Sequence, residues 1–152
     1  MEAERQTILH KEIDLIQECI KRMANNSFLI KGWTVSLIAV VLALAKDKID
    51  LMYICLILLI PVIGFWYLDT FFLRTEKMYR KMYEWVIKNR LQSDERMYEL
   101  DPRKYENEVE STKNVMFSST LKVFFGIPTL VLLFIILYNL FQIFFFPHCS
   151  RY

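Results

Sequence analysis

Hydrophobic and polar positions occur in long separate blocks along this chain. Apolar residues fill the runs Phe28–Ala45, Leu51–Leu68 and Val123–Pro147, whereas charged residues concentrate before residue 30 and between residues 74 and 122. A helix needs about 17–25 mostly apolar residues to cross a hydrocarbon core roughly 30 Å thick. Each run meets this requirement, and the buried helices of soluble proteins are usually shorter and amphipathic. The pattern therefore predicts an all-α integral membrane protein with three transmembrane helices.

The polar segments predict how these spans are connected. Only the short segment 46–50 separates the first two runs, so we expect them to form a tight helical hairpin. The chain then divides into a cytosolic amphipathic helix at 1–27, the hairpin at 28–69 (spans 28–45 and 51–68), a cytosolic helical region at 70–122, a third span at 123–147 and an extracytoplasmic tail at 148–152.

The distribution of basic residues predicts the orientation. Lys and Arg are frequent in segments 1–27 and 74–122, and beyond the opposite ends of the spans stand only Lys46, Lys48 and Arg151. Loops rich in Lys and Arg stay on the cytoplasmic side of a membrane. We therefore expect a multi-pass protein of the cell inner (plasma) membrane, with a cytosolic N-terminus and an extracytoplasmic C-terminus.

The N-terminal segment carries an apolar seam with heptad spacing. Its residues recur at intervals of 4, 3, 4 and 3, and they are Leu9, Ile13, Ile16, Ile20 and Met23. The seam could pack on the chain's own second cytosolic helix or on another subunit. A helix lying flat on the membrane is less favoured, because its polar face is as acidic as it is basic.

The second cytosolic helix is predicted at Arg74–Leu91. It carries a broad face of Met78, Met82, Tyr83 and Trp85, which needs a partner: either the heptad seam or another protein. After a break at Gln92–Leu100, Asp101 and Pro102 predict a helix start, with Asp as N-cap and Pro at the first helical position. No breaker follows until Gly126 and Pro128. We therefore expect one helix to run from Arg103 into the third span, with a kink near Pro128.

Small and polar residues predict contacts between helices in lipid, where close packing and polar bonds drive association. Gly32, Ser36, Ala39 and Ala43 form a small-residue stripe for docking another helix, of the same chain or of a neighbouring subunit. Asn139 and Gln142 lie one turn apart in the third span. Each should find a partner worth on the order of 1 kcal/mol, through an interhelical hydrogen bond or in a polar constriction of a pore.

Two charges lie near the cytosolic ends of the hairpin. Lys31 and Asp69 fall at similar depth when helical rise is counted from the short loop, so we expect them to pair. Arg74 is the alternative partner of Asp69. Ionisable residues within a membrane are functional candidates by default, but a position near the interface favours an anchoring role.

Composition argues against catalysis and against nucleic-acid binding. Apolar residues make up 55% of the 152 residues and charged residues 24%, and the net charge is only +2. Cys19, Cys55 and Cys149 lack the paired spacing of a disulfide framework or a zinc site. The two histidines, His10 and His148, are expected on opposite sides of the membrane. No catalytic motif occurs, so we expect a non-enzyme without catalytic residues, metal or cofactor.

Two segments resemble a known family. They are Arg22–Phe28 with Lys31-Gly32-Trp33 after it, and Phe65–Val86 (FWYLDTFFLRTEKMYRKMYEWV). Together they are similar to the RipA family of octameric bacterial membrane proteins, over roughly residues 10–90. The resemblance implies a ring in the bacterial inner membrane, an octamer in the family, with cytosolic helices as a collar. The matching residues are Arg22, Asn26, Ser27, Phe28, Lys31, Trp33, Asp69, Arg74, Glu76, Arg80 and Tyr83, and the charged ones among them form an expected interfacial charge network.

These features favour a homo-oligomeric membrane protein that acts as a scaffold or pore-like effector, with cytosolic helices that sense or bind a partner. By analogy, small proteins of this plan act as membrane-disrupting effectors in phage defence. The alternative is a membrane anchor or regulatory subunit that recruits a soluble protein through the Met78–Val86 face. A small transporter is disfavoured, because no charge lies at mid-membrane depth. The expected partners are the lipid bilayer, further copies of the chain and a cytosolic protein.

Overall fold

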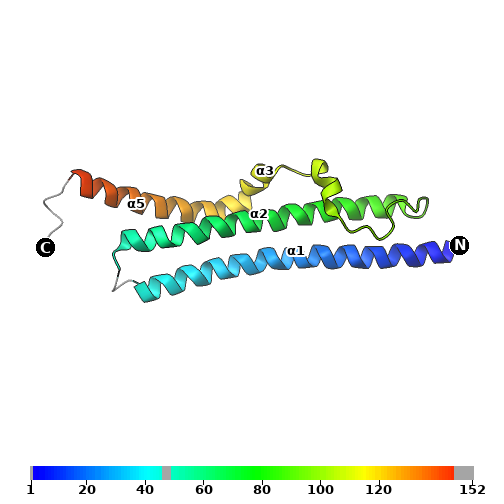
Figure 1. The fold of residues 1–152 in the computed structure, drawn as a ribbon, viewed down its shortest axis with the longest axis horizontal. Helices are drawn as coiled ribbons and strands as arrows, with labels where there is room; N and C mark the ends of the chain where they lie inside the picture. Colours follow the sequence, from blue (N-terminus) through cyan, green and yellow to red (C-terminus); the bar gives the residue numbers. More distant parts are fainter. Residues whose placement is uncertain (1, 46–48, 146–152) are drawn as a thin grey trace. The chain divides into compact units, whose positions relative to one another are not determined.

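The computed structural model of the protein describes residues 2–45 and 49–145. Within these residues the chain is all-helical, with 86% of them in helices and no β-strand, which confirms the predicted all-α class. The elements are α1 (Glu2–Ala45), α2 (Leu51–Asn89), the 3-10 helix η1 (Pro102–Glu108), α3 (Thr112–Met116), α4 (Ser119–Leu121), the π-helix η2 (Lys122–Gly126) and α5 (Ile127–Phe145). Figure 1 labels α1, α2, α3 and α5.

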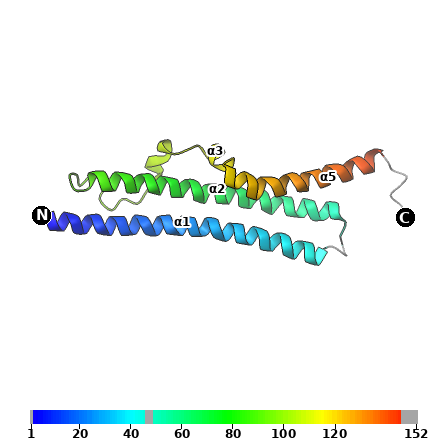
Figure 2. The ribbon, with the colours of Figure 1, turned by 180° about the vertical axis from the view of Figure 1, so that it is seen from behind.

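The described residues form two compact units. Unit 1 comprises the described parts of Met1–Leu29 and Asp69–Val115, and unit 2 those of Ile30–Leu68 and Met116–Tyr152. Both α1 and α2 are unbroken helices in Figures 1 and 2, and each contributes one part to each unit. The N-terminal amphipathic helix and the first predicted span are therefore one element of 44 residues.

Unit 1 has its core where α1 meets α2. Ile16 of α1 packs among Met78, Met82 and Val86 of α2 and Tyr105 of η1. The other residues of the heptad seam, Leu9, Ile13, Ile20 and Met23, surround this cluster and are partly buried. The seam therefore packs within its own chain, the first of the two arrangements that the sequence left open.

Unit 2 joins three helices around a smaller core. Ile54 and Leu58 of α2 pack against Ile38 and Val41 of α1 and Leu132 of α5. A second cluster lies where the third span begins and is centred on Trp66, described below. Most of the remaining apolar side chains of this unit are exposed.

Three helical stretches are long and apolar enough to cross a membrane: Ala3–Leu44, Leu51–Asn89 and Ser119–Phe145. They contain the three predicted spans, as far as the described residues extend. Pro61 lies inside α2 without ending it. Proline is tolerated in membrane helices because neighbouring groups satisfy the freed carbonyl.

The prediction of one helix from Arg103 into the third span is wrong. η1 ends at Glu108, and the next residue, Val109, has an extended backbone. New helices then begin at Thr112 (α3) and at Ser119 (α4), and α4 continues through η2 into α5. A serine stands before each new helix start. The Ser111 hydroxyl accepts a hydrogen bond from the Asn114 amide, and Ser118 is the extended N-cap residue of α4. The predicted irregularity near Pro128 takes the form of the π-helix immediately before it.

Part of the sequence-based picture lies outside the described residues. This applies to Lys46 and Lys48 in the hairpin loop, to the last two residues of the third predicted span, and to the tail 148–152 with His148 and Cys149.

Candidate functional site

The most elaborate polar arrangement of unit 1 is centred on Arg90, which follows the last residue of α2. Its guanidinium group is buried and forms an ion pair with both carboxylate oxygens of Glu12 on α1. The same group donates hydrogen bonds to the carbonyl oxygens of Ser93, Glu95 and Arg96 at 3.0, 2.7 and 3.2 Å. One side chain thus connects α1, the end of α2 and the loop that follows. We call this arrangement the Arg90 clamp.

The loop after α2 is shaped around this clamp. The Tyr98 amide donates to Glu12 Oε1 at 2.6 Å, and the backbones of Arg96 and Tyr98 both adopt positive φ values of 57°. Non-glycine residues seldom adopt this conformation, which costs on the order of 1 kcal/mol each. Charge-assisted hydrogen bonds in a buried site compensate for this cost.

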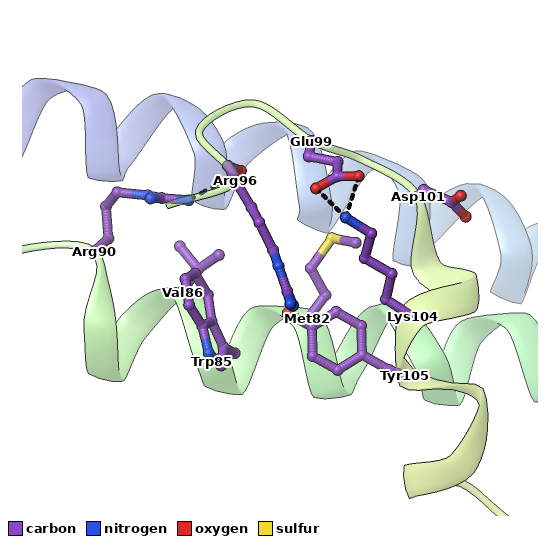
Figure 3. Close-up of a pocket in the computed structure, with 9 residues that line it drawn as sticks. All are labelled: Met82, Trp85, Val86, Arg90, Arg96, Glu99, Asp101, Lys104 and Tyr105. Atoms are coloured by element: carbon purple, nitrogen blue, oxygen red, sulfur yellow. Dashed lines mark hydrogen bonds and ion pairs between the residues drawn. The ribbon is translucent and has the colours of Figure 1, made fainter. Parts of the chain in front are cut away.

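The clamp is a structural site rather than a ligand pocket. Figure 3 shows the side chains of Trp85, Arg90 and Arg96 together with the Glu99–Lys104 ion pair around a small cavity. The guanidinium carbons of Arg90 and Arg96 lie 5.5 and 5.9 Å from the Trp85 ring centre, at cation–π distance. The cavity volume is only about 10 Å³, about the minimum that one water molecule requires.

A second set of contacts fixes the loop where η1 begins. Asp101 caps this helix by accepting from the Arg103 amide at 3.0 Å, and Pro102 follows at the first helical position, as the sequence predicts. Hydrogen bonds from the side chain and backbone of Arg103 lower the pKa of Asp101 to about 2. Tyr105 then inserts into the core of unit 1, and burial raises the pKa of its phenol.

A groove of 480 Å³ follows the surface between α1 and α2 in unit 1. Ile20 and Tyr83 provide apolar surface, and charged side chains, Lys21 from α1 with Arg80 and Glu84 from α2, line it as well. Arg80 forms an i,i+4 ion pair with Glu76 at 2.7 Å.

The face proposed to recruit a soluble partner is largely occupied by the chain itself. Met78 and Met82 are buried against α1, and Trp85 and Tyr83 are partly buried beside them. Of the two partners that the sequence left open for this face, the heptad seam of the same chain covers Met78 and Met82.

The expected interfacial charges are distributed over several local contacts. Asp69 is buried and accepts a hydrogen bond from the Ser27 hydroxyl. Arg74, the alternative partner for Asp69, instead pairs with Glu106 at 2.9 Å and donates to the Glu110 carbonyl. Arg22 is exposed and reaches the Cys19 sulfur at 3.9 Å. Lys31 and Asp69 belong to different units, and their pairing stays a prediction.

Two polar side chains of the third span were expected to form hydrogen bonds to another helix. Both form hydrogen bonds within their own helix. Asn139 Nδ2 donates to the Ile135 carbonyl at 2.8 Å, and Gln142 Nε2 donates to the Tyr138 hydroxyl at 2.9 Å, all within α5. Hydrogen bonds between residues one helical turn apart do not require a second helix. Gln142 and Tyr138 nevertheless remain exposed on the surface of the chain.

The small-residue stripe of the first span is also exposed. A Cβ added at Gly32 would meet nothing within 4 Å, and Ser36, Ala39 and Ala43 are exposed as well. The α1 residues that pack on α2 in this unit, Ile38 and Val41, lie on another face. Within the described chain no helix occupies the stripe.

Trp66 organises the start of the third span in unit 2. Its indole N–H donates to the Met116 carbonyl at 2.9 Å, and its ring lies edge-on to Phe117 and stacks on Phe125, with centroids 5.7 and 6.4 Å away. Gly126 lies close, since an added Cβ would be 3.7 Å from the ring. The sequence analysis placed Trp66 only at a span end and did not predict this role.

The Arg90 clamp was also missed, although the sequence contains a signal for it. Glu12 falls directly beside the apolar heptad position Ile13, on the face that packs against α2. A carboxylate on such a face requires a buried base, and Arg90 follows the apolar stripe of α2. That pairing could have been proposed.

Comparison with known proteins adds no assignment. No protein-family model matches the chain, and no curated protein or solved structure is detectably similar to it. The resemblance to the RipA family therefore stays a prediction. Among the described residues, no group of His, Cys, Asp and Glu side chains could hold a metal ion.

Proposed function

We propose that the protein is a homo-oligomeric integral membrane protein, with unit 2 in the bilayer and unit 1 in the cytosol. The observation that supports this proposal is the exposure of the apolar helices. In their most apolar stretches, only 11%, 28% and 22% of the residues are buried within the chain. Apolar surface of this extent is unstable in water and needs lipid or further subunits around it.

The polar and small residues of unit 2 support neighbouring subunits in addition to lipid. Gln142 and Tyr138 expose polar groups within the third span, and the Gly32–Ala43 stripe is exposed in the first span. Lipid offers no hydrogen-bonding partner to an exposed amide, whereas a second protein surface or a water-filled lumen does. An assembly that scaffolds the membrane or forms a pore-like effector accounts for both features.

Unit 1 supports the role of a compact cytosolic head. Its apolar seam and its Met face pack on each other, and the Arg90 clamp fixes the loop between α2 and η1. The alternative function, an anchor that recruits a soluble protein through Met78 and Met82, is disfavoured by the burial of these side chains. The resemblance to ring-forming RipA proteins supports the same proposal.

The test combines a mass measurement with a leakage assay. We expect the detergent-solubilised protein to have several times the chain mass of 18.3 kDa. Liposomes that contain the purified protein alone should release an entrapped dye if the assembly forms a pore, and should stay tight if it forms a scaffold. A monomeric mass, or release of the protein from membranes by alkaline carbonate, would refute the proposal.

A matched pair of variants separates pore from scaffold. Gln142→Leu removes the exposed amide of α5, whereas Ile143→Leu leaves it in place and changes a neighbouring exposed side chain. Leakage that Gln142→Leu abolishes and Ile143→Leu preserves assigns the amide to the lumen. Equal leakage from both variants would exclude Gln142 from the conduction path.

A further inference from the structure

The surface groove of unit 1 lies between α1 and α2 and is open. Its volume is 480 Å³, and its lining residues are Gln17, Ile20 and Lys21 of α1 with Arg80, Tyr83 and Glu84 of α2. Ile20 and Tyr83 pack against the core of this unit and form an apolar floor. η1 also packs on this core, but no described residue beyond α2 lines the groove. The groove therefore has room for side chains of a further helix.

The charges of the groove favour an acidic side chain beside α1. Lys21 forms no ion pair with any residue that the structure describes. Arg80 pairs with Glu76 through Nε and Nη2, and its side chain is 61% exposed. Glu84 already pairs with Lys81 at 3.0 Å. The groove thus offers a base without a counterion, Lys21, and a second base, Arg80, that can accept a further carboxylate.

The outer face of α1 carries such a carboxylate. Ile16 marks the buried side of the helix, and Glu18 lies about 160° away from it when each residue turns the helix by 100°. Glu18 is exposed and forms no ion pair within the described chain, because Arg22, one turn further, reaches the Cys19 sulfur instead. Leu15 lies beside Glu18 and is a large apolar side chain with 37% exposure. We call Leu15 and Glu18 the outer ridge.

Copies inserted in the same direction bring this ridge to the level of the groove. This step rests on the proposed function, a membrane assembly, with its symmetry axis along the membrane normal, so that residues of equal number lie at equal depth. Residues 17–21 line the groove on α1, and Glu18 of a neighbouring copy is only three residues, or about 4.5 Å, from the depth of Lys21. Because ridge and groove are different faces, Glu18 of one copy meets Lys21 of the next and not a second Glu18.

We infer that the groove of each copy receives the outer ridge of α1 from the next copy. Leu15 packs on the apolar floor, and Glu18 lies between Lys21 and Arg80. Every chain offers one ridge and one groove, so the contact is heterologous. Such a contact repeats from copy to copy and closes into a ring when the rotation between copies permits.

Cross-linking through engineered thiols tests the direction of this contact. In a background with Cys19, Cys55 and Cys149 replaced by Ala, Leu15→Cys marks the ridge and Glu84→Cys marks the groove. A short bismaleimide then joins thiols that lie close together in the assembly. We expect each single variant to run as a monomer on a denaturing gel and the two co-expressed variants to give dimers. The double variant should give a ladder of dimers, trimers and larger species, because only a chain with two different contact faces extends in this way.

Charge reversal tests the contact between Glu18 and Lys21. Lys21→Glu places an acid opposite Glu18 at every contact, and we expect dissociation of the detergent-solubilised assembly to become about tenfold easier. Lys88→Glu is the matched control, because Lys88 is exposed on α2 of the same unit and does not line the groove. Its effect should stay below about twofold. The double variant Glu18→Lys with Lys21→Glu exchanges the two charges and should restore most of the assembly.

The outcomes separate this contact from the proposed function. An assembly of normal mass that gives no ladder, or that gives dimers from Leu15→Cys alone, overturns the contact and leaves the proposed function standing. The same holds if Lys21→Glu dissociates no more easily than Lys88→Glu, or if Glu84→Cys cross-links to a different protein. A monomeric mass for the unmodified chain overturns both.

Discussion

The Arg90 clamp gives the sharpest test of the fold of unit 1. Arg90→Ala removes a guanidinium group that is almost fully buried and leaves the Glu12 carboxylate, 2% exposed as a residue, without its cation. Removing one partner of a buried ion pair costs about 3–5 kcal/mol. The loss also frees the carbonyl groups of Ser93, Glu95 and Arg96, so the loop should detach from α1.

Amide hydrogen exchange measures this effect at the position where it should be largest. The Tyr98 amide is bonded to Glu12, so its protection should fall by a factor of about 100 or more, since about 1.4 kcal/mol corresponds to a tenfold change. Arg5→Ala is the matched control. Arg5 also reaches this loop, through Asp94 at 3.3 Å and the Leu91 carbonyl, but its side chain is 41% exposed and its loss should cost less than about 1 kcal/mol.

A double variant separates charge from loop anchoring. Glu12→Leu with Arg90→Met removes both charges, and replacement of a buried pair by apolar residues is often close to neutral. Here we expect only partial recovery, because the loop carbonyls remain without a donor. If the Tyr98 amide exchanges no faster in the Arg90→Ala variant than in the Arg5→Ala variant, the clamp does not hold the loop. If the double variant is fully stable, the carbonyl bonds contribute nothing.

Further predictions concern single contacts. Trp66→Phe should destabilise unit 2 by about 1–3 kcal/mol in thermal unfolding, because the hydrogen bond to the Met116 carbonyl is lost. Gly126→Ala should not destabilise it, because the added Cβ would lie 3.7 Å from the Trp66 ring, which is an ordinary van der Waals contact. Ser27→Ala removes a buried hydrogen bond to Asp69 and should cost about 1–3 kcal/mol; an unchanged unfolding midpoint would contradict this. The folded pKa of Asp101 lies below its ordinary value of 3.8, so its cap contributes fully above pH 3.8 and is lost as the pH falls through about 2. NMR signals of the Arg103 amide should follow this acid window in the unmodified chain and not in Asp101→Asn.

The helical architecture could be predicted from the sequence because its signals are local and repeated. The apolar runs are long enough to cross a bilayer, and the heptad seam from Leu9 to Met23 matches the Met78–Val86 stripe that it meets. The Asp101–Pro102 helix start is also a local signal and is present.

The rest depends on contacts between distant residues. The helix predicted from Arg103 onward fails because new helices begin after Ser111 and Ser118, and single serines are common inside helices too. Asn139 and Gln142 form bonds within α5, which composition alone does not distinguish from bonds to a neighbouring helix. The Trp66 contacts could not be predicted from local sequence, because the indole N–H bonds to the carbonyl of Met116, 50 positions further along the chain.

The Arg90 clamp has a consequence for the order of events during biosynthesis. Glu12 and Arg90 are 78 positions apart, and the residues between the two segments of unit 1, 30–68, contain all but the first two residues of the first two predicted spans. At roughly 5–20 residues per second, a ribosome makes Arg90 about 4–16 s after Glu12. During that interval the acidic and apolar face of α1 has no native partner. Both hairpin helices must therefore be synthesised, and in a membrane protein delivered to the insertion machinery, before the head can close.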